Sequence, residues 1–395
     1  MIMQDNEKKP ALRFKGFTDP WEQREFEEIA VRSSVMSDKK GLPRVEYEDI
    51  ISGAGRLNKD IKLKESEKVG IVFHKGDVLY GKLRPYLQNW LLATFNGLAV
   101  GDFWVLQPQN TDSSFLYRLV QSQRFDGVAN QSTGTKMPRA DWKLVSKTKF
   151  AMPHSVDEQA AIGAYFEHLD TLITLHQRKY EKLVNIKKSM LDKMFPKNGA
   201  SVPEIRFKGF TDLWEQRKLK ELYFQLTERN TDLLPYQKTL SVATMSFKTD
   251  GNGAADTSLA NYKRLRTGDI AFEGHTSKEF RYGRFVLNDV GDGIMSPRFS
   301  ALRPLHEMPI NFWKYYIHYE PIMRKVLVNS TKAGTMMNEL VINDFLQGSI
   351  LVPSMTEQQA IGRFFKQLDT LITLHQRKLE KLQNIKKSCL EKMFV

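Results

Sequence analysis

Two long stretches of the chain show the hydrophobic periodicity of an amphipathic helix. Within residues 155–196 and 354–395, apolar side chains recur at alternating three- and four-residue spacing over about five heptads. A seam of this length predicts two long α-helices that pack together as a coiled coil. The predicted core positions of this coiled coil are Phe166, Leu169, Ile173, Leu183, Phe365, Leu368, Ile372 and Leu382.

The start of each predicted helix carries a recognisable signal. Ser155 and Glu158 have the S-x-x-E spacing of a capping box, and Ser354 and Glu357 repeat it. A proline precedes each serine by one or two residues, as is common where a turn leads into a helix. Both helices are therefore predicted to begin at these serines.

The two helical stretches are copies of one another. The eleven residues LDTLITLHQRK occur at 169–179 and again at 368–378, within longer matching segments. RFKGFTDPWEQR, which begins at Arg13, returns as RFKGFTDLWEQR at Arg206. Between these matching segments the two halves share only scattered residues, such as Phe103 with Phe299 and Leu106 with Leu302. The chain is thus an internal duplication in which a variable module precedes a near-constant helix.

The lengths of the connections predict how the repeats are arranged. Residues 197–205 are the only linker between the first helix and the second module, and about ten extended residues reach about 33 Å at most. The second helix should therefore begin where the first one ends, which predicts an antiparallel pair of rods of about 58 Å, with pseudo-twofold symmetry and one module at each end. The predicted segments are a tail (1–12), module 1 (13–154), helix 1 (155–196), the linker, module 2 (206–353) and helix 2 (354–395).

The variable modules show a mixed pattern. Short β-type runs at 78–80, 103–106, 270–272 and 285–287 are separated by Gly, Asp and Asn, whereas 112–125 and 311–327 have helical periodicity. The predicted fold is therefore α/β (α+β) for both globular modules, joined by the two helices.

Composition narrows the possible partners and the compartment. The chain has 395 residues and a net charge of +13, which favours a polyanionic partner such as nucleic acid or an anionic membrane surface. Its single cysteine rules out an intramolecular disulfide and a cysteine-rich zinc site, and it fits a reducing cytoplasm. No apolar run has the length of a signal peptide or a membrane span, so neither export nor a membrane partner is expected.

Motifs for independent catalysis are not found in the sequence. Gly76–Leu83 approaches a phosphate-binding loop, but Leu83 stands where a magnesium-binding Ser or Thr is needed, and Pro85 follows where a helix should begin. Asp141 and Lys143 are the nearest approach to a nuclease carboxylate–lysine set, and nothing upstream completes it. The loops of an adenine methyltransferase are lacking, and the histidines have no metal-site spacing. A catalytic residue or a metal ligand is therefore not predicted.

Four stretches mix phosphate-binding, base-edge and stacking side chains, as expected of DNA-contacting loops. An ordinary charged strand and turn would explain the stretches at 81–90 and 277–285 equally well, and the loops at 132–139 and 329–338 could equally cap the segments that follow them. In module 1 the candidate DNA-binding residues are Lys82, Arg84, Tyr86, Gln88, Asn89, Thr135, Lys136 and Arg139. In module 2 they are Lys278, Arg281, Tyr282, Arg284, Lys332, Thr335 and Asn338.

Taken together, these motifs resemble the specificity subunit of a type I restriction-modification enzyme. The chain resembles that family over nearly its whole length, through RFKGFTDPWEQR at the start of a module and a repeated EQ…I…LD pattern. The pattern comprises Glu158, Gln159, Ile162, Leu169 and Asp170, and again Glu357, Gln358, Ile361, Leu368 and Asp369.

The resemblance implies a non-catalytic subunit that binds double-stranded DNA. Each module would be a target recognition domain for one half of a bipartite, asymmetric site, and the helices would set the spacing and dock two modification (methyltransferase) subunits. S-adenosylmethionine would bind those subunits, and ATP and Mg²⁺ the restriction subunits of the full complex, so this chain would bind no cofactor. A stand-alone DNA-modifying enzyme and a coiled-coil interaction scaffold without a DNA role are the alternatives.

Overall fold

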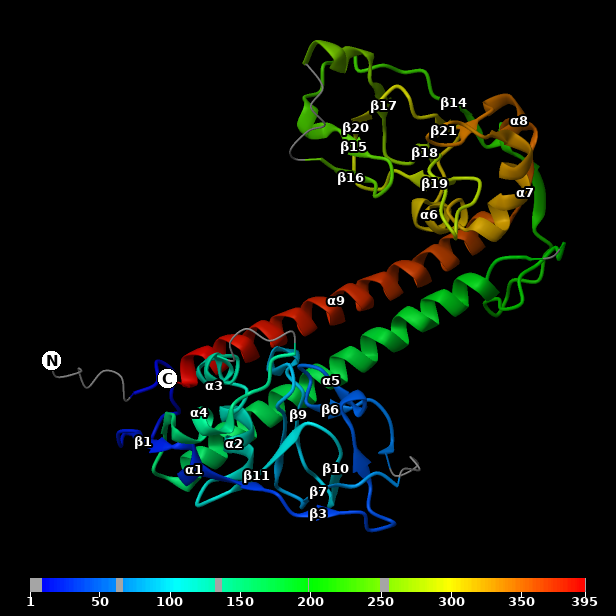
Figure 1. Cartoon of the computed structure of the whole chain (residues 1–395). Coiled ribbons are helices and arrows are strands. Elements are labelled where there is room, and N and C mark those ends of the chain that lie inside the picture. The colour runs from blue at the N-terminus through cyan, green and yellow to red at the C-terminus, as the bar shows by residue number, and fades with distance from the viewer. Residues whose placement is uncertain (1–8, 62–66, 132–136, 198, 249–255, 395) are drawn as a thin grey trace. The chain divides into compact units, whose positions relative to one another are not determined.

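The chain folds into two compact units, seen in a computed structural model that describes residues 9–61, 67–131, 137–197, 199–248 and 256–394 (Figure 1). Unit 1 comprises residues 1–177 and 376–395, and unit 2 comprises residues 178–375. Each unit contains one sheet-rich module and part of both long helices, α5 (Val156–Lys193) and α9 (Met355–Met393). Both helices therefore contribute to both units, and the predicted α/β modules joined by long helices are confirmed.

The helices begin where the serines predict. The hydroxyl oxygens of Ser155 and Ser354 accept hydrogen bonds from the backbone N–H groups of Glu158 and Glu357, each at 3.4 Å. This contact is one half of the predicted capping box. The two glutamate side chains are buried and serve a different purpose, which is described with the site.

Within each unit the two helices pack in opposite directions, as predicted. In unit 1, Asp170 of α5 pairs with Lys386 of α9, and Tyr165 contacts Cys389. In unit 2, Lys187 of α5 pairs with Asp369 of α9, and Phe195 packs on Phe365. The residue numbers therefore rise along one helix as they fall along the other. Among the predicted core positions, Phe166, Leu169, Phe365 and Leu368 are buried, whereas Ile173, Leu183, Ile372 and Leu382 are half-buried. The seam is therefore deepest where a module also covers it.

Module 1 is built on two small, mainly antiparallel sheets. One has the strand order β2-β11-β8-β9 and the other the order β3-β7-β10-β4, in which only the β10–β4 pair is parallel. Two further pairs, β1–β12 and β5–β6, complete the described strands. The bounds are β1 (Glu22–Glu25), β2 (Ala30–Ser33), β3 (Met36–Ser37), β4 (Arg44–Val45), β5 (Ile50–Ile51), β6 (Arg56–Leu57), β7 (Gly70–Phe73), β8 (Val78–Gly81), β9 (Trp90–Leu92), β10 (Gly97–Ala99), β11 (Phe103–Pro108) and β12 (Lys149–Met152).

Module 2 repeats the first of these sheets. Its order β14-β21-β18-β19 matches β2-β11-β8-β9, and β13–β24 matches β1–β12. The bounds are β13 (Glu215–Lys218), β14 (Tyr223–Gln225), β15 (Leu240–Ser241), β16 (Ser246–Phe247), β17 (Lys263–Leu265), β18 (Ile270–Glu273), β19 (Arg284–Leu287), β20 (Gly293–Met295), β21 (Ala301–Pro304), β22 (Thr331–Lys332), β23 (Glu339–Leu340) and β24 (Ser349–Val352). The shared topology shows that the diverged modules have kept one scaffold.

Short helices join these strands, and two of the predicted helices are each divided in two. The stretch 112–125 forms the end-to-end pair α2 and α3, because Asp112 and Ser122 each cap a new helix with a side-chain oxygen. The stretch 311–327 forms α6 and α7, and Pro321 stands in the first turn of α7. The bounds are α1 (Phe26–Ile29), α2 (Ser113–Leu119), α3 (Gln123–Ala129), α4 (Trp142–Lys147), α6 (Ile310–Tyr316), α7 (Glu320–Ser330) and α8 (Ile342–Gln347).

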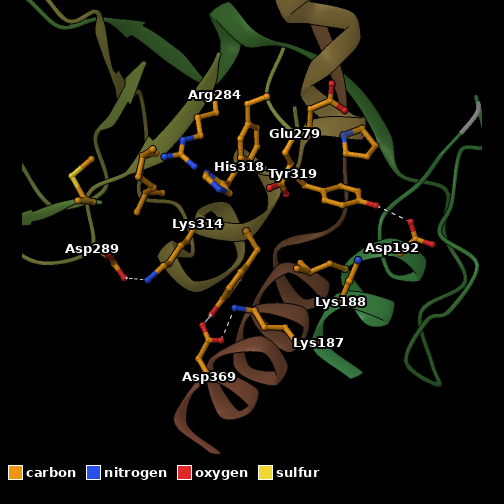
Figure 2. Close-up of a pocket in the computed structure, with 18 of the residues that line it drawn as sticks. Lys187, Lys188, Asp192, Glu279, Arg284, Asp289, Lys314, His318, Tyr319 and Asp369 are labelled. Carbon is orange, nitrogen blue, oxygen red and sulfur yellow. Dashed lines mark hydrogen bonds and ion pairs between the residues drawn. The ribbon is translucent and has the colours of Figure 1, made fainter. Parts of the chain in front are cut away.

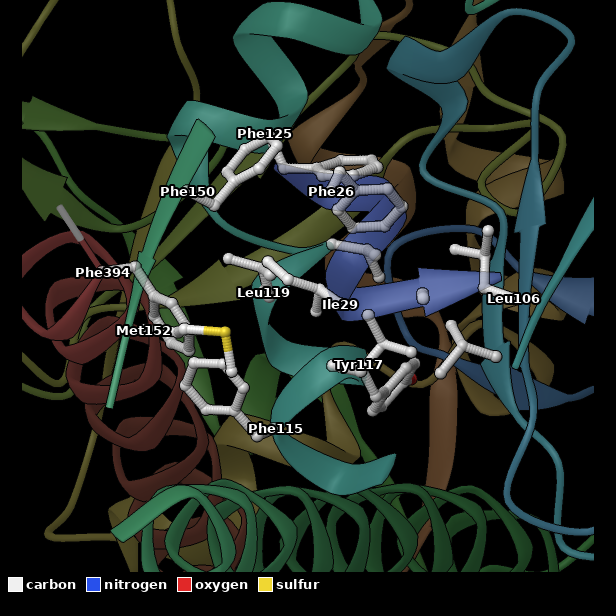
Figure 3. Packing of buried hydrophobic residues seen from close by; sticks show 14 of the residues in the cluster. Phe26, Ile29, Leu106, Phe115, Tyr117, Leu119, Phe125, Phe150, Met152 and Phe394 are labelled. Carbon is white, nitrogen blue, oxygen red and sulfur yellow. The ribbon is translucent and has the colours of Figure 1, made fainter. Parts of the chain in front are cut away.

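Each module shares its hydrophobic core with the ends of the long helices. In unit 1, Phe394 packs on Trp21, Phe115 and Phe166, within a cluster that also holds Phe26 (Figure 3). In unit 2 the equivalent phenylalanine at the end of α5 packs on α6 and α9. The core of each module is therefore completed by the end of the helix that belongs to the other repeat.

Candidate nucleic-acid interface

The repeated EQ motif anchors each module to the helix that follows it. Glu158 accepts two hydrogen bonds from Arg13, at 2.6 and 2.7 Å, and one from Trp21. Glu357 accepts the same pair from Arg206, both at 2.7 Å. These bidentate ion pairs explain why the sequence repeats an arginine at the start of a module and a glutamate at the start of its helix.

The glutamine that follows each glutamate also connects the module to its helix. Gln159 accepts a hydrogen bond from the backbone N–H of Asp112, which caps α2. Gln358 accepts one from the indole N–H of Trp313 in α6. In each module this is the first helix after the central strands. Each glutamine also donates to the carbonyl of the proline before its helix, at 2.9 Å. Buried amides whose donors and acceptors are both used hold a fixed orientation.

The aspartate of the repeated LD pair connects the two long helices to the module. Asp170 contacts Lys386 of α9 at 2.7 Å and Arg118 of α2 at 2.7 Å. Asp369 contacts Lys187 of α5 at 2.6 Å and the hydroxyl of Tyr315 in α6. The near-constant residues of the repeats thus fix the orientation of each module on the helical pair, which positions whatever site the variable loops form.

A cleft of about 940 Å³ lies in unit 2 between module 2 and the long helices (Figure 2). Its lining carries charges of both signs, and two pairs form within it, Lys314 with Asp289 and Lys187 with Asp369. His318 lies in the cleft and binds the carbonyl of Phe285, and burial lowers its pKa. Because its positive and negative groups neutralise one another, this cleft is poorly suited to a phosphate backbone.

Unit 1 has a smaller cleft of about 510 Å³ at the equivalent joint. Its lining includes Asp170, Lys386 and Lys387, the repeat equivalents of Asp369, Lys187 and Lys188 in unit 2. Both clefts therefore lie at the duplicated joint, and residues of the long helices and of the variable module line each of them.

In module 1 the structure brings together two of the stretches that the sequence selects. The backbone N–H of Arg84 donates to the carbonyl of Pro138 at 2.7 Å, and that of Ala140 donates to the carbonyl of Lys82 at 2.8 Å. The β8–β9 loop therefore lies against the segment that ends at Arg139, although more than fifty residues separate them in sequence. Such convergence of two polar loops on one side of a sheet is the arrangement expected of a binding surface.

The β8–β9 loop has an unusual backbone. Arg84 and Gln88 both have left-handed φ values, 48° and 56°, on either side of the short 3-10 turn Pro85–Leu87. Left-handed conformations cost energy in residues other than glycine, and they concentrate at functional sites. The turn presents Tyr86 with 54% of its surface exposed, as a stacking residue would need.

An acidic residue organises this surface. Asp102, which precedes β11, binds Lys82 at 3.5 Å and Arg139 at 3.0 Å, and its backbone carbonyl accepts the hydroxyl of Tyr47. Sequence reasoning missed Asp102 because a carboxylate is not expected on a DNA-facing surface. The signal that could have located it is its place beside Phe103, which aligns with Phe299 in module 2.

Module 2 brings together the equivalent stretches. The backbone N–H of Asn338 donates to the carbonyl of Gly274 at 2.9 Å, and its side-chain amide donates to the carbonyl of Arg281 at 3.3 Å. The β18–β19 loop and the β22–β23 hairpin therefore form one surface, on which Lys278, Lys332 and Thr335 are exposed. This loop follows the strand that is equivalent to β8, so both modules place their candidate residues at the same position of the shared sheet.

Some of the predicted residues lie elsewhere. Asn89 is only 8% exposed, so its side chain is buried beneath the loop. Gln88 is exposed but lines the cleft of unit 1. Arg284 lines the cleft of unit 2, where it donates to the carbonyl of Ala243 and lies over the ring of Phe280. Thr135 and Lys136 fall outside the described residues.

The two weak catalytic candidates have structural roles. Asp141 caps α4 by accepting the backbone N–H of Lys143 at 2.8 Å, and Trp142 packs on Phe26 and Trp104. The stretch from Gly76 contains the buried strand β8, which runs between β11 and β9. Its side chains are therefore used by the sheet.

Comparison with known proteins decides the family. The family model described as "Type I restriction modification DNA specificity domain" matches residues 212–384. The chain is 24% identical over 299 residues to the type I restriction enzyme MjaVIII specificity subunit of Methanocaldococcus jannaschii, which covers 70% of this chain and 68% of that one. It is 26% identical over 127 residues to the Escherichia coli type I restriction enzyme EcoDI specificity subunit, across 31% of this chain and 28% of the relative.

The chain is similar to the type I restriction enzyme specificity subunits.

The fold agrees with this assignment. The crystal structure of the type I restriction-modification system S subunit from M. genitalium covers 98% of this chain and 99% of its own, with a TM-score of 0.59 and 12% identity. The prediction of a non-catalytic specificity subunit is confirmed, because the relatives of this chain are themselves specificity subunits. Among the described residues of this chain, no helix combines the length and apolar character needed to cross a bilayer.

Proposed function

We propose that this specificity subunit selects the DNA target of a type I restriction-modification complex, with each module reading one half of a bipartite, asymmetric site. The observation that carries the proposal is the convergence, in both modules, of two polar loops at the same position of an equivalent sheet. Because the joints are nearly constant and the loops differ, the two modules read different half-sites. The segments predicted from sequence, 13–154 and 206–353, are the target recognition domains in this proposal.

The candidate side chains divide by role. Arg139 and Arg281 are suited to bidentate contacts with base edges, and Tyr86 to stacking or a thymine methyl contact. Lys82, Lys278 and Lys332 are suited to phosphates, so binding weakens steeply with salt. Arg84, Tyr282, Thr335 and Asn338 remain in the proposed surface. Asn89, Gln88 and Arg284 are left out of it because of where their side chains lie.

The other subunits supply the chemistry in this proposal. Two modification subunits dock on the duplicated helices, one for each repeat, and bind S-adenosylmethionine, while the restriction subunits use ATP and Mg²⁺. The duplication of the helical sequence supports two equivalent docking surfaces, since near-constant residues occur in both units. The complex acts on chromosomal DNA, which places this subunit in the cytoplasm.

Methylome sequencing of cells that express this chain with its modification subunit tests the proposal. The expected result is one bipartite motif containing methylated adenines, with a fixed gap between its halves. Arg139→Ala should relax one half only, and Arg281→Ala the other half only. Arg217→Ala, which removes an exposed arginine paired with Glu215 and Glu221, is the control and should leave both halves unchanged. A continuous motif, or a change in both halves from one substitution, would contradict the proposal.

A further inference from the structure

The two modules carry opposite charges at one equivalent position. In the shared sheet, Leu106 of β11 pairs with Val78, and Leu302 of β21 pairs with Ile270, so these strands occupy the same place. Counting back from the aligned Phe103 and Phe299, Asp102 in module 1 corresponds to Arg298 in module 2. Both residues precede the central strand, at the end of the sheet where the converging loops lie.

The acid in module 1 is fully engaged by cations. Asp102 holds Arg139 at 3.0 Å and Lys82 at 3.5 Å, so its charge is balanced by the residues that we expect to face DNA. In this module the arginine is delivered by the other loop, and the residue before the central strand serves to position it.

Arg298 in module 2 is arranged differently. Its side chain is exposed, and among the described residues no ion pair involves it. The guanidinium lies over the ring of Phe299, 5.5 Å from its centroid, which restricts its motion without consuming its donors. None of its N–H groups donates to another residue in the part of the chain that the structure describes, so they are available for a ligand there.

Arg298 also borders a hollow formed by the converging segments. A surface pocket of about 380 Å³ is lined by Arg298, Thr335, Met336 and Asn338 together with the ends of the central strands. Asn338 is already fixed by its bonds to Gly274 and Arg281. The hollow thus combines a fork of donors, a hydroxyl, an amide, the carboxylate of Glu339 and a methionine that is 76% exposed.

We propose that Arg298 is a specificity-determining residue of module 2 that contacts a guanine through its O6 and N7 acceptors. The planar fork of an arginine matches these two acceptors, which is the commonest specific contact in the major groove. This inference rests on the proposed function. In module 2 the base-contacting arginine, Arg298, would lie just before the central strand. In module 1 the corresponding role would fall to the loop residue Arg139, which Asp102 positions.

Binding measurements on the complex with the modification subunit test this assignment. Duplexes carry the methylated motif or single base-pair changes within it, and the proteins are wild type, Arg298→Ala, Arg298→Lys and Arg266→Ala. Arg266 is exposed and paired with Glu228 at the opposite end of β18, so its substitution controls for loss of one positive charge. Unfolding midpoints within error of wild type exclude a general loss of structure.

Arg298→Ala should lower affinity for the target about 10-fold to 100-fold and abolish discrimination at one G·C pair. That pair should lie in the half-site that Asn338→Ala alters and Arg139→Ala does not. Arg298→Lys should not restore discrimination, since an ammonium lacks the fork. Arg266→Ala should leave discrimination unchanged.

Two outcomes would overturn the inference while leaving the proposed function intact. One is a selective complex whose discrimination survives Arg298→Ala. The other is an affinity loss that is equal for every duplex and is repaired by lysine, which would make Arg298 a phosphate contact. A wild-type complex without any bipartite preference would instead refute the proposed function and this inference together.

Discussion

Single residues explain why parts of the repeat are nearly constant. Arg13 and Arg206 begin the two modules. Each forms an ion pair with a glutamate that is buried at the start of a long helix. The carboxylate of Glu357 is 1% exposed, whereas the guanidinium side chain of Arg206 is 15% exposed. The two partners of one ion pair should therefore respond differently to substitution.

We expect Arg206→Met to destabilise unit 2 by roughly 3 to 5 kcal/mol, because it leaves a buried carboxylate without its cation. Glu357→Gln should cost less, because the remaining arginine can turn towards water. Hydrogen exchange resolved by segment measures the effect in unit 2, with unit 1 as the internal reference. Equal losses for the two variants would show that the burial of an unpaired carboxylate does not govern the stability of this joint.

The pKa of His318 predicts a pH dependence. Burial lowers this pKa below its ordinary value of 6.5, with smaller contributions from Arg284 and Lys187. The unfolded chain therefore takes up a proton more readily, so this histidine's contribution is complete above pH 6.5 and is lost as pH falls below it. Thermal unfolding of His318→Phe should lose less stability than wild type between pH 7.5 and pH 5.5. A parallel fall in both proteins would assign the acid sensitivity to carboxylates.

Sequence reasoning selected loops in which basic, amide and aromatic side chains alternate, and the structure brings these loops together in each module. That they contact DNA stays a prediction. The sequence does not indicate that Asn89 is buried, because the tight turn that ends at Gln88 changes which side chains along the loop face outward. Arg284 opens β19 and lines the cleft of unit 2, a position that its sequence context does not indicate.

Elements dock closely where a glycine interrupts the long helices. A Cβ added to Gly362 would lie 2.7 Å from the backbone nitrogen of Phe312, and one added to Gly163 would overlap the side chain of Ser114. These glycines let α6 and α2 approach the helix backbone. Glycine is normally disfavoured inside a helix. The glycine that follows Ile162 and Ile361 is therefore explained by this close packing.

Gly362→Ala should destabilise unit 2 by about 1 to 3 kcal/mol, because the backbone of α6 must move. Gly127→Ala in α3 is the matched control, since nothing lies within 4 Å of its added Cβ. It should stabilise the chain by about 0.5 to 1 kcal/mol through reduced freedom of the unfolded state. Chemical denaturation measures both values. A stabilising Gly362→Ala would mean that α6 does not need this close approach.

The long helices were the most predictable elements. Their periodicity over five heptads and their serine caps placed both ends within a few residues. The shorter helices were less predictable, because 112–125 is periodic throughout and only the side-chain caps of Asp112 and Ser122 divide it. The strand order was beyond sequence reasoning, since pairs such as β1–β12 join segments more than a hundred residues apart.

Across the whole molecule, each repeat completes the other. Phe394 at the end of α9 belongs to the core of module 1, and Phe195 at the end of α5 belongs to the core of module 2. Phe394→Ala should therefore destabilise unit 1, and Phe195→Ala unit 2, each by about 3 to 5 kcal/mol. Segment-resolved hydrogen exchange separates the two effects. Loss of protection in the module that precedes the altered helix in sequence, and not in the other, would contradict this exchange of helix ends.

The duplicated helices also make the proposed spacing testable. The two long helices pair through Asp170–Lys386 in unit 1 and through Lys187–Asp369 in unit 2. Four residues added to both helices, after Gln177 and after Gln376, preserve the two ion pairs and lengthen each helix by about 6 Å. Since base pairs rise by about 3.4 Å, the gap in the methylated motif should grow by one or two base pairs while both halves keep their sequence. Altered half-site letters, detected by methylome sequencing, would show that the helices take part in reading the bases.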